Sequence, residues 1–133
     1  MTSPTEKLRK QIRSLADIRH NPDLLITAIE EIEVCNEKGS HDRSPQCPNC
    51  GAWKNHWEKL TGKIWPDTCC RVNCDNKATD GGHIVFAGDI TGRCYIVPLC
   101  SSCNGLSPNQ HYTIKAGTVM ISANCSDTCD KLK

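Results

Sequence analysis

The stretch CCRVNCDNKATDGGHIVFAGDITGRCYIVPLCSSCN, residues 69–104, decides the fold. Two cysteine pairs, Cys69/Cys74 and Cys100/Cys103, flank a segment that is rich in strand-forming residues. Zinc prefers four thiolate or imidazole ligands in a tetrahedron, and two close cysteine pairs can supply all four. The stretch therefore predicts a zinc site that holds a β-hairpin against the start of a helix.

The first cysteine pair can be formed in two ways. The C-x-x-C pair at residues 100–103 has the usual two-residue gap and follows a strand expected at residues 95–98. On the other side of the site, Cys69 leaves a four-residue gap to Cys74, whereas Cys70 leaves a gap of three. We expect Cys69 to be the ligand.

The composition favours zinc over disulfide bonds. The chain has 133 residues, of which 38% are hydrophobic and 5% aromatic, so its core is thin and needs a metal or disulfide staple. Its eleven cysteines are an odd number, which argues against a fully paired disulfide framework. The first residues lack a secretory signal, and no apolar run approaches the ~18 residues that span a bilayer. We therefore expect an intracellular, cytoplasmic protein without a membrane segment, which keeps its thiols for metal.

A second knuckle, Cys47-Pro-Asn-Cys50, predicts another zinc site. A second pair is the simplest complement, so we expect Cys125 and Cys129 to complete it. Other candidate ligands are His56, His41 and Cys35, including a set of Cys47, Cys50, His56 and one more residue. Cys94 and Cys35 are otherwise expected to be ordinary buried thiols.

The N-terminal third predicts two amphipathic helices, over residues 3–20 and about 22–36, separated by Asn21-Pro22. The first helix is basic and the second is acidic, so an antiparallel helical hairpin over residues 1–40 is expected. This hairpin is also a candidate surface for homo-oligomer formation. The zinc-binding domain would then span residues 41–133.

Two further predictions complete an α+β fold. A third helix is expected over residues 52–60, ended by Gly62. Its apolar residues share one face: Trp53, Trp57 and Leu60. After the turn GLSPNQ, residues 111–114 and 118–123 read as two strands of a hairpin.

The charge balance limits the kinds of partner. The formal net charge is +1 and the pI is near 7.5. Dedicated nucleic-acid binders more often carry a strong basic excess. This balance argues against a large, salt-sensitive affinity that is built from many phosphate contacts.

The order of the motifs resembles the HNH endonuclease group, whose ββα-metal site lies on a treble-clef zinc scaffold. The matching residues are the first cysteine pair, GGHI at 81–84 and LCSSCN at 99–104. The W-x3-W segment from Trp53 to Trp57 and the YIVPLC strand are similar to small uncharacterised HNH-like proteins. The resemblance covers residues 47–129 and implies a treble-clef core.

The resemblance also implies a catalytic site. His83 stands where the family has the general base that activates water, and Asn104 stands where it has a metal ligand at the helix start. The cofactor would be Mg²⁺ or Mn²⁺. Two glycines, at 81–82, replace the usual acidic or histidine neighbour, and Asp80 would lie on the opposite strand face from His83. The family's middle asparagine has no counterpart, although His111 could supply a late ligand.

Two functions follow from the sequence. The first is a zinc-stabilised, HNH-like scaffold that acts as an interaction module for a protein or a nucleic acid, without nuclease activity. In that case His83 has a structural role: it binds a backbone group, closes the hairpin or replaces a cysteine at zinc. The alternative is a metal-dependent endonuclease with His83 as general base. A thiol-based redox enzyme is a third interpretation, but the adjacent cysteines lack the base that a nucleophilic thiol needs.

Overall fold

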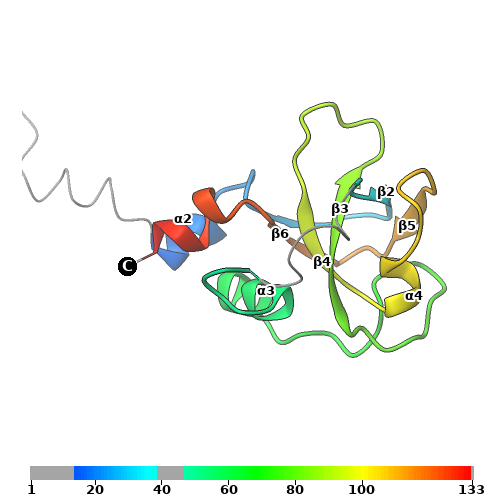
Figure 1. Cartoon of the computed structure of the whole chain (residues 1–133), viewed down its shortest axis with the longest axis horizontal. Coiled ribbons are helices and arrows are strands. Elements are labelled where there is room, and N and C mark those ends of the chain that lie inside the picture. Colours follow the sequence, from blue (N-terminus) through cyan, green and yellow to red (C-terminus); the bar gives the residue numbers. More distant parts are fainter. Residues whose placement is uncertain (1–13, 39–46, 133) are drawn as a thin grey trace, which may run out of the picture.

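A computed structural model describes residues 14–38 and 47–132 of the chain, and within them the fold is α+β. Its elements are α2 (Leu15–Arg19), β1 (Leu25–Thr27), β2 (Ile32–Asn36), α3 (Trp53–Thr61), β3 (Asp80–Phe86), β4 (Tyr95–Leu99), α4 (Ser101–Asn104), β5 (Tyr112–Ile114) and β6 (Val119–Ser122). Two 3₁₀ turns follow, η2 (Cys125–Asp127) and η3 (Cys129–Lys131). The strands form one antiparallel sheet in the order β1-β6-β4-β3-β2-β5 (Figure 1).

The sheet is curled, because short connections join strands near its opposite edges. β1 leads directly to β2, and β5 leads directly to β6, although three or more strands separate the members of each pair in the sheet. The two connections are hydrogen-bonded to each other. Ala28 N donates to Thr118 O at 2.9 Å, and Gly117 N donates to Ala28 O at 2.7 Å. These bonds continue the β1–β6 ladder into the two connections, and the shortness of the connections bends the strands between them around a core.

β4 separates two small cores, since all five of its residues are buried. Side chains alternate along a strand, so one face of β4 serves each core. The first core contains Val34, Ile84, Tyr95, Val97, Leu99, Tyr112, Ile114 and Met120 together with Cys69, Cys100 and Cys103. The second core contains Ile18, Leu24, Trp53, Trp57, Leu60, Trp65, Ile96 and Ile121 together with Cys47 and Cys129. Each core thus includes its own group of cysteines.

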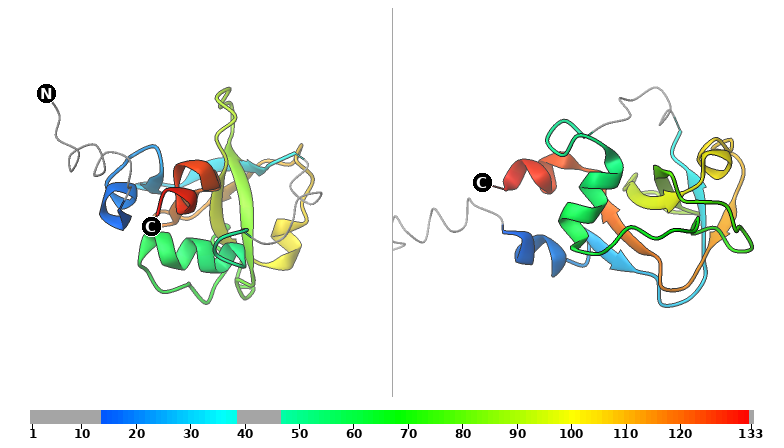
Figure 2. Two further views of the ribbon diagram at one scale, coloured as in Figure 1. Left: turned by 60° about the vertical axis from the view of Figure 1, so that its left-hand side comes forward. Right: turned by 90° about the horizontal axis from the view of Figure 1, so that it is seen from below.

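Two consecutive glycines in β3 allow helices to approach both of its faces. A Cβ atom on Gly81 would lie 2.6 Å from Trp53 Cβ of α3. One on Gly82 would lie 2.3 Å from Leu99 Cδ1 and 3.1 Å from Asn104 Oδ1 of α4. The distances of 2.6 Å and 2.3 Å are shorter than real Cβ contacts, so a side chain at either position would force its neighbours to shift. Accordingly, α3 and α4 lie on opposite sides of the β3–β4 hairpin (Figures 1 and 2).

The helix predicted over residues 52–60 is confirmed as α3, Trp53–Thr61. It ends at Gly62, whose positive φ of 71° lets its amide donate to Glu58 O. The predicted apolar face is buried: Trp53 is 8% exposed, Trp57 2% and Leu60 0%. Trp57 Nε1 also donates to Val119 O at 2.8 Å, which ties α3 to β6.

The prediction of a second helix over residues 22–36, as part of a helical hairpin, is wrong. These residues form β1 and β2, and both strands belong to the same sheet as β3 to β6. Val34 and Asn36 are buried because they alternate along β2 and share its inner face. Of the first expected helix, residues 15–19 are helical as α2, and the part before residue 14 lies outside the described residues. The proposed oligomer surface therefore loses its second helix.

The hairpin expected from residues 111–114 and 118–123 is also wrong in its pairing. Both strands exist, but β5 pairs with β2 whereas β6 pairs with β1 and β4. Lys115 N donates to Cys70 O, which directs the chain across the knuckle after β5. In the described part of the chain, no helix is both long and apolar enough to cross a membrane.

Candidate metal centres

Four cysteines of the first core, called here the four-cysteine cluster, bring their sulfur atoms together. These are Cys69, Cys74, Cys100 and Cys103, and their Sγ atoms all lie within 4.8 Å of one another. Cys74 Sγ is 3.9 Å from Cys100 Sγ and 4.0 Å from Cys103 Sγ. Sulfurs about 2.3 Å from a central zinc in a tetrahedron are about 3.8 Å apart. The spacing therefore fits a metal ion held by four thiolates.

Local hydrogen bonds fix the turns that carry these cysteines. In the first turn Cys74 N donates to Arg71 O at 3.1 Å, and Asn73 takes a positive φ of 64°, which asparagine tolerates. In the second, Cys100 is the N-cap of α4, and its Sγ accepts from the Cys103 amide at 3.4 Å. Lys115 Nζ donates to the carbonyls of Cys69, at 3.0 Å, and Cys74, at 3.4 Å. Hydrogen bonds within each turn and from Lys115 therefore fix the positions of these cysteines.

The electrostatics of this cluster favour a cation. Burial raises the pKa of the Cys100 thiol, but hydrogen bonds from the Cys103 amide and from Asn76 outweigh it and lower this pKa to about 6. Burial raises the pKa of the Cys103 thiol to about 12. The neighbouring sulfurs contribute to this rise, because they make a second thiolate more costly. A divalent cation would offset that repulsion and displace the remaining protons.

Cys69, and not Cys70, belongs to the four-cysteine cluster. Cys69 is fully buried with its sulfur among the other three. The side chain of Cys70 lines a separate, mainly apolar hollow of about 290 Å³ together with Trp57 and Pro98. Burial raises the pKa of the Cys70 thiol, which keeps it protonated there. The backbone turns between these neighbours, so two adjacent cysteines have different environments.

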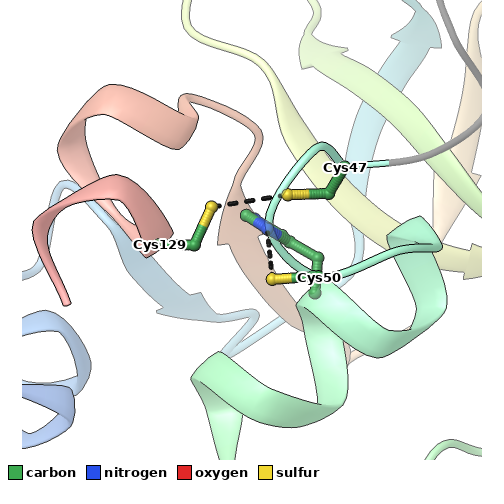
Figure 3. A group of neighbouring side chains, drawn as sticks. Cys47, Cys50 and Cys129 are labelled. Atoms are coloured by element: carbon green, nitrogen blue, oxygen red, sulfur yellow. Dashed lines mark hydrogen bonds between the residues drawn. The ribbon is translucent and has the colours of Figure 1, made fainter. Parts of the chain in front are cut away.

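A second group, called here the mixed cluster, forms in the second core. It consists of Cys47, Cys50, His56 and Cys129, whose ligand atoms also lie within 4.8 Å of one another (Figure 3). Cys47 Sγ is 3.4 Å from Cys129 Sγ, and Cys50 Sγ is 3.8 Å from His56 Nδ1. Cys47 and Cys50 come from the knuckle before α3, His56 from α3 itself and Cys129 from η3. This cluster could likewise hold a metal ion.

His56 has the orientation of a metal ligand. It is fully buried, and its Nε2 lies 2.9 Å from the carbonyl oxygen of Ser122. A carbonyl only accepts, so Nε2 carries the proton and donates it, and the lone pair is left on Nδ1, which faces Cys50. Burial lowers the pKa of His56, which keeps the ring neutral. Metal-binding histidines commonly donate their second nitrogen to a carbonyl in this way.

The expected partner Cys125 lies beside the mixed cluster. Its Sγ is 3.3 Å from Cys47 Sγ, and its side chain is half-buried on η2. The set of mutually close ligand atoms contains His56 in place of Cys125. The structure therefore assembles the alternative that includes His56, while all the cysteines first expected at this site also gather there. Asn49 of the knuckle donates to Asp130 of η3, which further joins the two segments.

The residues of the implied nuclease site do not converge. The ring of His83 packs edge-on against Trp53 of α3, with 4.6 Å between ring centroids. Asn104 lies across the strand, where its Nδ2 donates to Asp80 Oδ2 at 3.0 Å. Asp80 and Gly82 face α4, whereas Gly81 and His83 face α3, as the alternation along β3 requires. His83 and Asn104 are therefore on opposite faces of the sheet.

The other candidate ligands lie elsewhere or outside the described residues. His111 Nδ1 is 2.7 Å from Glu33 Oε1 in an exposed pair at the β2–β5 ladder. Cys35 and Cys94 are half-buried thiols that belong to neither cluster. His41 falls in residues 39–46, which are not described.

Comparisons of the chain with protein-family models, with curated proteins and with solved structures give no match. The resemblance to HNH endonucleases thus rests on the motifs of the sequence alone.

Proposed function

We propose that the protein is a zinc-stabilised interaction module that binds two zinc ions, one in each cluster. The observation that carries this proposal is the convergence of two separate sets of four ligand atoms, one in each of the two cores. Thiolate and imidazole ligands in this number favour zinc over hard cations, which prefer oxygen. The ions would have a structural role, because the hydrophobic core is thin and each ion links segments that are distant in the sequence.

The arrangement around the four-cysteine cluster supports a treble-clef scaffold. A knuckle at residues 69–74 precedes the β3–β4 hairpin, and the second cysteine pair lies at the start of α4. This is the order of knuckle, hairpin and helix that the sequence motifs imply. We include the treble-clef scaffold and its relation to HNH-like proteins in this proposal.

The number of ligands supports an interaction role over a catalytic one. A catalytic zinc keeps an open position for water, whereas each cluster supplies four protein ligands and fills the coordination sphere. The partner is a protein or a nucleic acid. The net charge of +1 gives no large basic excess for binding phosphates.

Metal content tests the proposal. Protein purified without added chelator is expected to contain two zinc ions per chain, measured by elemental analysis against protein concentration. Prolonged chelation should remove both ions and abolish the native near-ultraviolet circular dichroism, because structural zinc contributes on the order of 10 kcal/mol to small zinc-dependent folds. A metal-free protein that stays folded would contradict the proposal.

A cleavage assay tests the endonuclease alternative. Purified protein is incubated with plasmid DNA or single-stranded RNA and Mg²⁺ or Mn²⁺, beside a His83→Ala variant. We expect no cleavage above background from either protein, because His83 and Asn104 lie on opposite faces of β3. Cleavage that disappears in the variant would support the nuclease and refute a purely interacting role.

A further inference from the structure

The mixed cluster has more donors than one zinc ion needs. Four ligand atoms fill a tetrahedron, yet Cys125 brings a fifth donor to within 3.3 Å of Cys47. Among the described residues, no fifth sulfur makes a comparable contact with the four-cysteine cluster, and the neighbouring Cys70 lines a separate hollow. The two clusters therefore differ in the chemistry open to them.

We propose that Cys125 makes the mixed cluster a redox switch, in which a peroxide joins Cys125 to Cys47 and thereby releases the metal ion. This inference rests on the proposed function, since it needs zinc in the mixed cluster. Its geometric basis is the contact between Cys47, which belongs to the set of four mutually close ligand atoms, and Cys125, which lies outside that set.

Exposure decides which sulfur reacts first. Cys47 is 1% exposed, whereas Cys125 is half-buried on the short turn η2. The peroxide therefore reaches Cys125. Cys125 first loses its thiol proton to water, and the thiolate then attacks one oxygen of the O–O bond. This gives a sulfenic acid on Cys125, and the alkoxide, or hydroxide from hydrogen peroxide, leaves and takes up a proton to become an alcohol or water.

Cys47 completes the reaction. Its thiolate attacks the sulfur of the Cys125 sulfenic acid, the S–S bond forms, and hydroxide leaves and becomes water by taking one proton. Overall two electrons pass from the two sulfurs to the peroxide. Cys47 then no longer offers a thiolate, and only Cys50, His56 and Cys129 remain as ligands. A site with three of its four ligands holds zinc much more weakly.

The direct contact makes this pair the favoured one. Cys129 is also near Cys47, at 3.4 Å, but it is buried and is itself a ligand in the cluster. Cys125 needs no change in coordination before it reacts. An added dithiol would reduce the disulfide by exchange and be oxidised to its own disulfide, which would restore both thiols and allow the ion to return.

The test follows zinc and disulfides in the same sample. Zinc-loaded protein and a Cys125→Ser variant are treated with one equivalent of hydrogen peroxide, with a Cys35→Ser variant as control because Cys35 is a half-buried thiol outside both clusters. Released zinc is measured with a chromogenic chelator, and disulfides are mapped by peptide mass spectrometry. Wild type and control are expected to form the Cys47–Cys125 disulfide and to release one of two ions. Reduction with added zinc should restore the second.

The zinc content and the release rate of the variant separate the redox switch from the proposed function. The Cys125→Ser variant should hold two ions before oxidation and release zinc on the order of tenfold more slowly. If it binds only one ion, Cys125 is a ligand and the switch is refuted, while the proposed function stands. An equal release rate, or a disulfide between another pair in wild type, also refutes the switch. Wild type that contains no zinc refutes both proposals.

Discussion

Replacing Cys103 by serine is expected to remove one zinc ion and to unfold the protein at 25 °C. Cys103 is buried in the first core, and its sulfur belongs to the four-cysteine cluster. Structural zinc contributes on the order of 10 kcal/mol, which is comparable to the ~5–15 kcal/mol that stabilises a typical domain. The measurements are zinc content and the dispersion of amide signals in NMR spectra.

The matched control for this substitution is Cys35→Ser. Cys35 lies on β2, is half-buried and belongs to neither cluster. This variant should keep two zinc ions and lose no more than about 1 kcal/mol of unfolding free energy. If Cys103→Ser kept both ions and its native spectrum, the four-cysteine cluster would not be a structural zinc site.

Replacing Trp57 by alanine is expected to lower the free energy of unfolding by about 3–5 kcal/mol. Trp57 is 2% exposed in the second core, where its ring packs edge-on against Trp65 with 5.3 Å between centroids. The change would leave a cavity and would also remove the hydrogen bond to Val119 O. Urea unfolding followed by far-ultraviolet circular dichroism measures the loss.

Two variants control for this result. Ile64→Ala removes a large apolar side chain that is 91% exposed, so its effect should stay within about 0.5 kcal/mol. Trp57→Phe keeps much of the apolar volume but leaves Val119 O without this donor, so its loss should be intermediate. A Trp57→Ala variant as stable as Ile64→Ala would mean that α3 is not anchored to the second core through this ring.

Sequence patterns predicted the elements whose signals are local. The spacing of Trp53, Trp57 and Leu60 and the stop at Gly62 were enough for α3, because a helix and its caps depend on neighbours along the chain. The apolar run at residues 95–98 similarly predicted β4. The knuckle spacing predicted which cysteines of the first core come together.

Strands β1 and β2 could not be predicted, because the spacing of their apolar residues fits both the period of a helix and that of a strand. The apolar residues from 25 to 35 match a helical stripe, yet Ile32, Val34 and Asn36 also alternate as a strand requires. Contacts far along the chain decide between them. Asn36 Nδ2 donates to Cys103 O and Leu106 O, both at 2.9 Å, and Asn36 Oδ1 accepts from Tyr112 OH at 2.6 Å.

At the mixed cluster, the sequence left open whether Cys125 or His56 joins Cys47, Cys50 and Cys129. Cys125 and Cys129 form an obvious pair in the sequence, and His56 is a single histidine on a helix. Only the curled sheet places Ser122 O beside His56 Nε2, which turns Nδ1 toward the knuckle. Strand alternation predicted opposite faces for Asp80 and His83, and β3 does begin at Asp80. The position of Asn104 on the face of Asp80 needed the structure.

The position of the two clusters along the chain has a consequence for synthesis on the ribosome. Every ligand of the four-cysteine cluster has been made when Cys103 emerges, whereas the mixed cluster joins Cys47 to Cys129 and stays incomplete until the last turns appear. Folding can begin while synthesis continues, with the N-terminal units of a chain folding first. The first ion can therefore be captured around a nascent β3–β4 hairpin. The knuckle at Cys47 and Cys50 must wait, with its thiols unoccupied, for η3.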